Sequence, residues 1–273
     1  MTTVVRLDDG ALTAVDMHGT GPAVLCIHGI TSSRRSWTRL AEYLADRYRT
    51  IAYDQRGHGD SAAVSGPMTL ERSVADSRSV LDAAGGEAAA VIGHSWGGAV
   101  ALLAGQDPRI RSVIAVDPMV RVRPGTWGAD YLDDTAADMA LEPQERERVL
   151  RARHADWHPL DVEGKLHAVR SMTAEPIARL GSENHVDRAG WNLLPSLADY
   201  PKPLLFCVAD PSESVVGADD LSLIRRSAGR KLRVVEFPGE GHNLHRTAFE
   251  RFAAAVDAFI GDAGVPQARP SQG

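Results

Sequence analysis

A serine between two glycines is the first feature of this sequence that indicates chemistry. Ser95 lies in the segment GHSWGG, after the apolar run AAAVI and before the helix-like run AVALLAG. The segment matches Gly-x-Ser-x-Gly, a pattern in which a sharp strand-to-helix turn holds the serine in a strained conformation. Such a turn leaves no room for Cβ atoms at Gly93 and Gly97. The sequence therefore predicts that Ser95 is a nucleophile rather than an ordinary turn residue.

A histidine far along the chain is the candidate base for this serine. A serine hydroxyl is a poor nucleophile unless a base removes its proton as it attacks. The segment VVEFPGEGHNLHR places His242 in a loop beyond the last apolar run, where Gly239 and Gly241 allow the backbone to turn. We predict that His242 is the base, with His245 as the nearest alternative.

Short apolar runs alternate with helix-like segments along most of the chain. Their nearly continuous hydrophobicity indicates strands covered on both faces, as in a parallel sheet, and the alternation with helices favours a wound α/β fold. The predicted strands span residues 23–29, 49–57, 88–95, 110–118, 203–210 and 232–239. The predicted helices span residues 36–47, 70–85, 97–108 and 247–262.

A charged, helix-like stretch without a convincing buried strand interrupts this pattern. We interpret residues 119–196 as a helical cap inserted into one core, which residues 1–118 and 197–262 form, and residues 263–273 as a disordered tail. Bulky apolar residues of the cap are candidates to line a pocket, and its arginines are candidates to meet an anionic substrate, although packing and solvated helix faces are commoner roles. These residues are Trp127, Tyr131, Trp157, Met172, Trp191, Arg121, Arg123, Arg151 and Arg153.

Four segments together resemble the α/β-hydrolase superfamily, namely HGITSSRRSW, YDQRGHGDS, GHSWGG and GEGHNLH. The resemblance spans nearly the whole chain outside the cap. It implies an eight-stranded, mostly parallel sheet and a triad in the chain order serine, acid, histidine. It also implies an oxyanion hole formed by two backbone amides, which by position belong to Ile30 and Trp96. In YDQRGHGDS we interpret Asp54, Arg56 and the glycines as turn and loop scaffolding.

The acid of the implied triad departs from the family's usual pattern. The family usually carries Gly-x-x-Asp after the strand before the last one, whereas PLLFCVADPSESVVG has Ala209 and Ser212 at those positions. Three carboxylates are candidates. Asp210, directly at the strand end, is ranked first; Asp117, after the previous strand, is second, since some family members carry their acid there; Glu213 is third. Each would accept the Nδ1 proton of the histidine and stabilise its imidazolium form.

These residues predict a cofactor-free serine hydrolase that acts on a small carboxylic ester or lactone through an acyl-enzyme on Ser95. Hydrolysis of an amide, a thioester or a carbon–carbon bond stays open, because the fold and the triad do not choose the substrate. A non-catalytic ligand receptor of the same fold also stays open. No metal is assigned, because His154 and His158 in HADWHP lack the glutamate of H-E-x-x-H.

Composition and charge argue against several other classes of protein. The 273 residues are 44% hydrophobic and 24% charged, as in globular proteins, and the net charge of −6 provides no basic surface for nucleic acid. No run reaches the roughly 20 apolar residues of a membrane helix, and no secretory signal is apparent. Cys26 and Cys207 lie in apolar runs and are expected to be reduced. We therefore predict a cytoplasmic protein of open oligomeric state.

Overall fold

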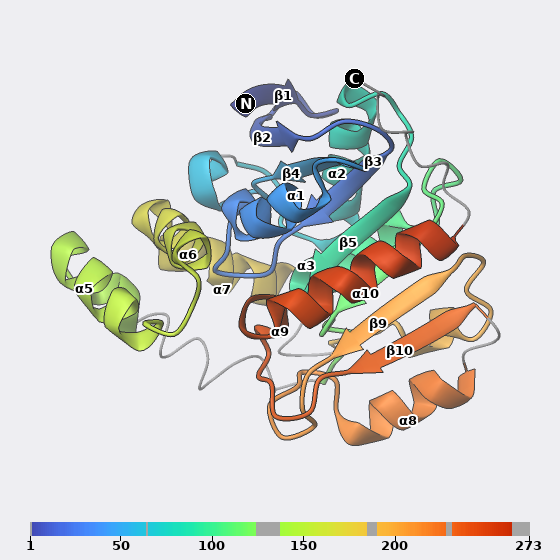
Figure 1. The fold of residues 1–273 in the computed structure, drawn as a ribbon. Coiled ribbons are helices and arrows are strands. Elements are labelled where there is room, and N and C mark those ends of the chain that lie inside the picture. The colour runs from blue at the N-terminus through green and yellow to red at the C-terminus, as the bar shows by residue number, and fades with distance from the viewer. Residues whose placement is uncertain (1, 64, 124–136, 185–189, 228–230, 264–273) are drawn as a thin grey trace.

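An eight-stranded sheet forms the centre of the molecule (Figure 1). The computed structural model describes residues 2–63, 65–123, 137–184, 190–227 and 231–263. In sheet order the strands are β1 (Thr2–Arg6), β2 (Leu12–His18), β4 (Arg49–Tyr53), β3 (Ala23–Ile27), β5 (Ala90–His94), β6 (Val113–Val116), β9 (Leu204–Val208) and β10 (Leu232–Glu236). Strand β2 is antiparallel to β1 and β4, and all the other pairs are parallel. The predicted eight-stranded, mostly parallel sheet is confirmed.

Helices cover both faces of the sheet, because its central strands are apolar on both sides. Every residue of β3, β5 and β9 is buried. One apolar core lies between the sheet and α2, α3 and α8, and a second lies between the sheet and α1 and α10. These helices are α1 (Thr38–Leu44), α2 (Leu70–Ala83), α3 (Trp96–Ala104), α8 (Ala218–Ser227) and α10 (Phe249–Asp262). Shorter turns are η1 (Arg34–Trp37), η2 (Gly59–Ser61), η3 (Leu194–Leu197) and α9 (Leu244–Thr247).

The spacing of apolar residues determines the face that each helix buries. In α10, Phe249, Phe252, Val256 and Phe259 recur every three or four residues, and all four are buried against the second core. Burial of one such side chain contributes about 1.5–3 kcal/mol, so this stripe holds the last helix on the sheet.

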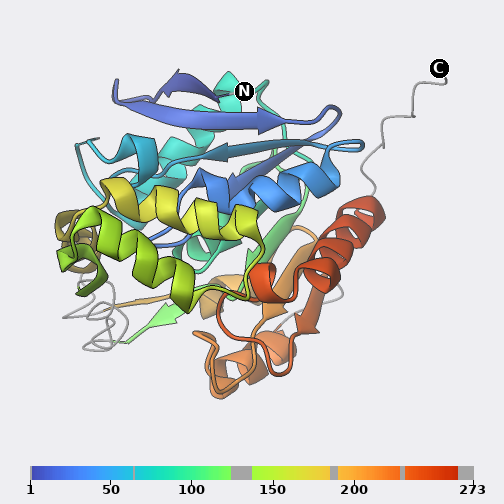
Figure 2. The same ribbon diagram turned by 60° about the vertical axis from the view of Figure 1, so that its left-hand side comes forward.

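Between β6 and β9 the chain forms a helical segment beside the sheet. It contains α5 (Pro143–Arg153), α6 (Pro159–Ser171) and α7 (Ala174–Glu183), and Figure 2 shows α5 and α6 side by side. The segment also contains a short antiparallel pair that the sequence did not predict, β7 (Arg121–Val122) and β8 (Trp191–Asn192). Trp127, Tyr131 and residues 264–273 of the predicted tail lie outside the described residues.

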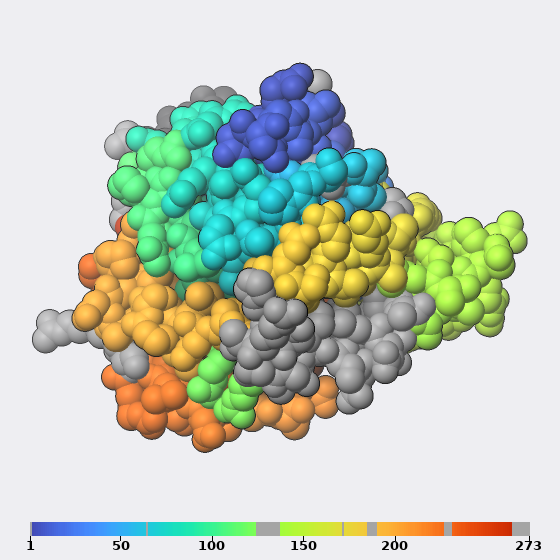
Figure 3. All heavy atoms as spheres, turned by 180° about the vertical axis from the view of Figure 1, so that it is seen from behind, coloured from blue at the N-terminus to red at the C-terminus, as the bar shows by residue number. Residues whose placement is uncertain are grey.

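Hydrogen bonds join α7 to the core. The backbone N–H of Met68 donates to Glu183 (2.6 Å), and that of Leu70 donates to Asn184 (2.9 Å). In Figure 3, which shows the molecule from behind, the yellow segment that includes α7 lies against the cyan segment at the start of α2. The end of the helical segment is therefore anchored where α2 begins.

Both cysteines are free and buried, as expected for a reduced protein. Burial raises the pKa of the Cys26 and Cys207 thiols. Every helix in the described ranges is either too short or too polar to span a membrane.

Candidate active site

The carboxyl edge of the parallel strands gathers the candidate reactive residues. Ser95 directly follows β5, Asp117 directly follows β6, and His242 lies in the loop between β10 and α9. Because β5 and β6 are neighbours in a parallel sheet, their ends meet at one edge. Residues that are far apart in the sequence are thus brought to one place by topology alone.

Ser95 occupies the strained turn that the sequence predicts. Its φ and ψ angles are 56° and −119°, and its backbone N–H donates to Val116 (3.0 Å). A Cβ atom on Gly93 would lie 1.9 Å from the carbonyl oxygen of Gly97, and one on Gly97 would lie 2.3 Å from the carbonyl oxygen of Ile27. The two glycines are therefore required for the close passage of strand, turn and helix, as expected.

A buried carboxylate holds the candidate base. Nδ1 of His242 lies 2.6 Å from Oδ2 of Asp117, and the Asp117 side chain is fully buried. Asp117 also accepts hydrogen bonds from the backbone N–H groups of Ala209 (3.1 Å) and Val215 (3.1 Å) and from the hydroxyl of Ser214 (2.5 Å). These donors satisfy a charge that would otherwise be costly to bury. The Nδ1 proton of His242 is thereby directed at Asp117, which leaves Nε2 as its basic atom.

The structure corrects the first choice of acid. The carboxylate of Asp210 accepts from the backbone N–H of Gly239 (2.9 Å) and from the N–H (3.1 Å) and hydroxyl (2.8 Å) of Ser212. These hydrogen bonds lower the pKa of Asp210 and commit its side chain to Ser212 in its own loop and to Gly239 in the loop after β10. Glu213 is exposed on the same loop. Asp117, ranked second from the sequence, is the carboxylate that meets His242.

Backbone strain is concentrated at this edge of the sheet. Among the described residues, the non-glycine residues with positive φ are Thr31 (57°), Ser95 (56°) and Asp117 (39°). Conformations of this kind cost of order 1–3 kcal/mol each and persist where the surrounding structure enforces them. All three residues follow strands of the parallel sheet, so the strained backbone lies where groups are positioned around one site.

The two predicted oxyanion amides belong to residues whose backbone lies near Ser95. Trp96 begins α3, so its N–H is one of the first amides of a helix, which have no partner within the helix. Ile30 lies in the loop after β3, which approaches Ser95 closely: a Cβ atom on Gly29 would be 3.1 Å from Cβ of Ser95. The assignment of these amides to an oxyanion hole stays a prediction.

Two further histidines lie beside the base: the sequence named His245 only as the alternative base and gave His94 no role. The His94 ring centroid lies 4.5 Å from that of His242 and 4.3 Å from that of His245. Burial lowers the pKa of His94 and of His245, so both are neutral near pH 7. Nε2 of neutral His94 donates to the backbone carbonyl of His242 (2.9 Å) and so holds the loop that carries the base. The sequence signal that could have identified His94 was its position directly before Ser95.

A cavity of about 180 Å³ joins these residues to the helical segment. Ser95, His94, His242 and the loop 30–32 line one side of it. The remaining described residues of its lining are Asp138, Arg153, His154, Trp157, Lys165, Asn243 and Arg246. Of the cap residues named from the sequence, Arg153 and Trp157 thus reach the cavity.

The other named cap residues have structural contacts. Met172 is buried, and Trp191 donates from Nε1 to the carbonyl of Met119 (2.8 Å). The arginines at 121 and 151 form ion pairs away from the cavity, with Asp220 and with Glu147 and Glu163 respectively. Arg123 is exposed. The prediction that cap arginines meet the substrate is therefore limited to Arg153.

The charged residues of the cavity come mainly from α5, α6 and α9. Arg153 forms an ion pair with Asp138 (2.6 Å). Nζ of Lys165 donates to the carbonyl oxygen (3.2 Å) and the hydroxyl (3.3 Å) of Thr31, and burial together with Arg246 lowers the pKa of this lysine to about 8. Its ammonium is therefore still mainly charged at pH 7. Neither Lys165 nor Arg246 was identified from the sequence.

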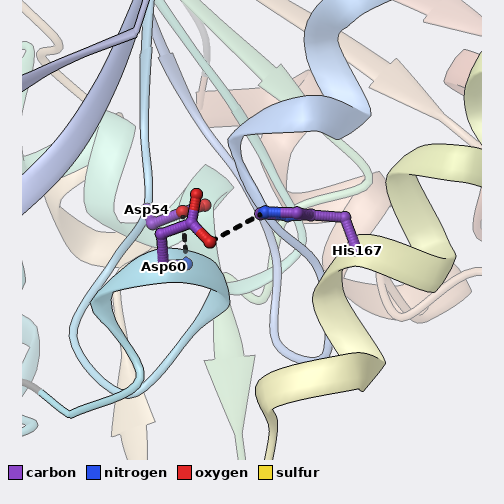
Figure 4. A group of neighbouring side chains, drawn as sticks. All are labelled: Asp54, Asp60 and His167. Atoms are coloured by element: carbon purple, nitrogen blue, oxygen red, sulfur yellow. Dashed lines mark hydrogen bonds and ion pairs between the residues drawn. The ribbon is translucent and has the colours of Figure 1, made fainter.

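Away from this cavity, Asp54, Asp60 and His167 form the one group of three potential metal ligands among the described residues (Figure 4). Nε2 of His167 lies 3.2 Å from Asp60. The guanidinium of Arg34 pairs with both carboxylates, and the backbone N–H groups of Arg34 and Asp60 donate to Asp54 (2.7 and 2.9 Å). The guanidinium of Arg34 already supplies a cation to both carboxylates, so we interpret the group as a structural ion cluster.

Arg56 and Gly59 of YDQRGHGDS also form scaffolding, as the sequence predicts. Arg56 pairs with the buried Asp76 (2.5 Å) and with Asp9 (2.7 Å). Gly59 has a φ angle of 50°, and a Cβ atom there would lie 2.4 Å from the carboxylate of Asp54. The two histidines considered for a metal have other contacts: His154 stacks on Trp157, and His158 caps α6.

Known proteins resemble this chain along most of its length. A model of the alpha/beta hydrolase family matches residues 24–255. The chain is 29% identical to 2-(acetamidomethylene)succinate hydrolase of Mesorhizobium japonicum, with 93% of this chain and 94% of that protein covered. It is 27% identical to 2-succinyl-6-hydroxy-2,4-cyclohexadiene-1-carboxylate synthase of Yersinia enterocolitica, with 93% and 92% covered. The solved enol-lactonase of Burkholderia xenovorans shares the fold, with a TM-score of 0.73, 18% identity and coverage of 95% and 100%.

Proposed function

The chain belongs to the alpha/beta hydrolase family, and from this premise we propose that it is a serine hydrolase that cleaves carboxylic esters or lactones through an acyl-enzyme on Ser95. One observation carries the proposal: the base His242 is hydrogen-bonded to the buried Asp117 (2.6 Å) and lines the same cavity as Ser95. A serine in a strained turn is by itself compatible with a structural role. A neighbouring histidine whose Nδ1 faces a buried carboxylate supports a catalytic one.

Acylation begins when Oγ of Ser95 attacks the carbonyl carbon of the substrate and Nε2 of His242 takes the hydroxyl proton. Asp117 stabilises the imidazolium, and the backbone amides of Ile30 and Trp96 donate to the oxyanion. Each such donor is worth about 2.7–4 kcal/mol in related chemistry. The intermediate then collapses, the carbon–oxygen bond breaks, and His242 passes its proton to the leaving oxygen.

Deacylation uses the same groups with water as the nucleophile. His242 takes a proton from water, the resulting hydroxide attacks the acyl carbon, and the proton returns to Oγ of Ser95 as the bond to the serine breaks. The products are a carboxylic acid and the regenerated serine. For a lactone, the acid and the alcohol remain parts of one molecule.

The matched proteins support hydrolysis as the class of reaction. One of the two whole-chain relatives is named as a hydrolase, and the structural neighbour is named as an enol-lactonase. Amide or carbon–carbon bond hydrolysis by the same residues, and ligand binding without catalysis, are the alternatives. Both whole-chain relatives are named for compounds that carry carboxylates, so the substrates tested should include carboxylate-bearing esters.

Labelling with a fluorophosphonate tests the proposal, because such reagents phosphonylate activated serines. We expect one adduct on Ser95, located by peptide mass spectrometry, and none in Ser95→Ala. The wild type should hydrolyse members of a panel of 4-nitrophenyl esters and lactones faster than matched anilides and β-diketones, and equally well in EDTA. A protein that neither turns over the panel nor forms the adduct would instead be a receptor, and faster cleavage of the anilides or diketones would reassign the bond.

A further inference from the structure

The loop 30–32 contains a strained residue next to the proposed oxyanion amide. Thr31 is buried and has a φ angle of 57°, and Ile30, directly before it, carries the proposed amide. A threonine in the left-handed region is costly and stays there only where its surroundings enforce it. The loop runs from β3 to η1, which both pack in the core. Because the ends are fixed, a change in φ at Thr31 would turn the neighbouring peptide planes, including the one that carries the Ile30 N–H.

A lysine of the helical segment contacts this strained residue. Nζ of Lys165, in α6, donates to the carbonyl oxygen (3.2 Å) and to the hydroxyl (3.3 Å) of Thr31. Hydrogen bonds from a charged donor are stronger than those between neutral groups. Contacts to the backbone and to the side chain of one residue oppose its rotation out of the left-handed region.

The helix that carries Lys165 is itself fixed against the end of the same loop. Helix α6 packs on η1 and α1 (Figure 2). A Cβ atom on Gly164 would lie 2.9 Å from the carbonyl oxygen of Arg35, so the glycine permits this close approach. The hydroxyl of Ser33 donates to the carbonyl of Gly164 (3.2 Å). The backbone next to Lys165 therefore has a fixed position relative to η1, and the lysine side chain spans a fixed distance to Thr31.

The position of Lys165 costs free energy. Burial and the neighbouring cation of Arg246 lower the pKa of its ammonium to about 8, and the carboxylate of Asp138 offsets only part of this effect. The charged form is therefore less favourable here than in water, and an apolar side chain of similar length would avoid the cost. A residue that is costly to place and contacts a reactive site is expected to serve function rather than stability.

We propose that Lys165 is a positioning residue for the oxyanion hole. By donating to Thr31 it keeps that residue in its left-handed conformation, and so keeps the Ile30 N–H directed at the oxyanion of a substrate bonded to Ser95. The inference rests on the proposed function, because the oxyanion forms only when Ser95 attacks a carbonyl. It gives the helical segment an effect on the rate of the reaction, besides any effect on the fit of the substrate.

Esters and thionoesters distinguish a fault in the oxyanion hole from a general loss of structure. A thionoester has sulfur in place of the carbonyl oxygen, and because sulfur is the weaker hydrogen-bond acceptor it gains less from the oxyanion amides. A misplaced amide should therefore slow hydrolysis of the ester more than that of the thionoester. The assay uses the 4-nitrophenyl ester that the wild type hydrolyses fastest, together with its thionoester.

The substitution Lys165→Met keeps the length of the side chain and removes the ammonium. We expect a folded protein whose kcat for the ester is about tenfold to hundredfold lower and whose KM stays within about threefold of the wild type, as for a small misplacement of a group near the reaction. The ratio of kcat/KM for the ester to that for the thionoester should fall at least about threefold, because part of the oxyanion stabilisation is lost. A wild-type kcat and ratio in this variant, or an equal loss on both substrates, overturns the inference and leaves the serine hydrolase standing.

A matched control and a chemical rescue use the same helix. Arg170→Met should leave kcat and the ratio unchanged, because Arg170 is exposed on α6 and pairs with Glu147 (3.4 Å). In Lys165→Cys, alkylation by 2-bromoethylamine, in which the thiolate displaces bromide, restores an ammonium at the same reach. Cys26 and Cys207 should not react, because both are buried and their pKa values are raised. Alkylation should restore the ratio, and a fully alkylated enzyme that stays as slow as before contradicts the inference.

The wild type tests the inference even where the variants fail to fold. In a crystal structure of its phosphonate adduct on Ser95, the phosphonyl oxygen should accept from the Ile30 N–H at about 2.7–3.1 Å while Nζ of Lys165 stays on Thr31. The same amide contact with Lys165 turned away from Thr31, or an oxygen that does not reach Ile30, overturns the inference. A wild type that hydrolyses no ester and forms no adduct overturns the proposed function itself.

Discussion

Replacement of Asp117 by asparagine is the most direct perturbation of the proposed catalytic pair. Oδ2 of Asp117 accepts from His242 and from the backbone N–H of Val215, and Oδ1 accepts from the backbone N–H of Ala209 and from the hydroxyl of Ser214. Backbone N–H groups cannot accept hydrogen bonds. Either orientation of an asparagine amide therefore directs its NH₂ group at a backbone donor, and both orientations lack the negative charge.

The kinetic cost of Asp117→Asn should exceed its structural cost. One unpaired buried N–H costs about 1–3 kcal/mol of folding stability. Loss of the carboxylate removes the partner of the imidazolium and, in one orientation, favours the tautomer whose Nε2 carries the proton. In serine proteases the same substitution lowers kcat about 10⁴-fold, which corresponds to about 5.5 kcal/mol. We expect a folded protein whose kcat is lower by about three to four orders of magnitude.

The assay compares kcat for a 4-nitrophenyl ester, the rate of phosphonylation of Ser95 and the thermal midpoint. Asp210→Asn is the matched control, because Asp210 also follows a strand of the sheet but its carboxylate bonds only to Gly239 and Ser212 in the described residues. Its kcat should stay within about threefold of the wild type, as for substitutions outside a site. An Asp117→Asn enzyme within about tenfold of the wild type, or an equal loss in Asp210→Asn, would refute the assignment.

Two further outcomes follow from the packing and protonation of the site. Gly93→Ala places a Cβ atom 1.9 Å from the carbonyl oxygen of Gly97 and should cost more than about 3 kcal/mol in urea unfolding, whereas Gly217→Ala, with open space around it, should stay within about 1 kcal/mol. Burial lowers the pKa values of His94 and His245, so both are neutral in the folded protein. Below about pH 6.5 the unfolded chain therefore binds more protons than the folded protein. The folded protein therefore loses stability as the pH falls below about 6.5. Calorimetry between about pH 8 and 5 should show that the unfolding temperature of His245→Gln depends less steeply on pH than that of the wild type. Equal slopes for the two proteins would contradict this prediction.

The parallel part of the sheet could be predicted from the sequence, because a strand that is buried on both faces has a nearly continuous apolar sequence. Strands β3 (AVLCI) and β9 (LLFCV) are of this kind. The antiparallel strands β1 and β2 lie at the edge of the sheet and expose much of their surface, and they have no such sequence pattern. The expectation of eight strands, which includes these two, came from the family resemblance alone.

The acid could not be predicted with the same certainty, because its identity depends on backbone direction rather than on residue type. Asp117 and Asp210 both follow buried strands. Asp117 has a φ angle of 39° and its carboxylate meets His242, whereas Asp210 accepts hydrogen bonds from Ser212 and Gly239. Aspartate enters the left-handed region more readily than most residues, yet nothing in the sequence marks the position where it does so.

Lys165 was the least predictable residue of the site, since its sequence context indicates an ordinary surface helix. It reaches the cavity only because Gly164 allows α6 to pack directly on η1. The loop 30–32 then has several partners: Thr31 accepts from Lys165, Ser32 accepts from Arg246, and Ile30 carries the proposed oxyanion amide. The helical segment thus contacts, through Lys165, the same short loop that carries the proposed oxyanion amide. This contact gives a physical reason why changes in inserted helices can affect such a site while the serine, histidine and acid stay the same.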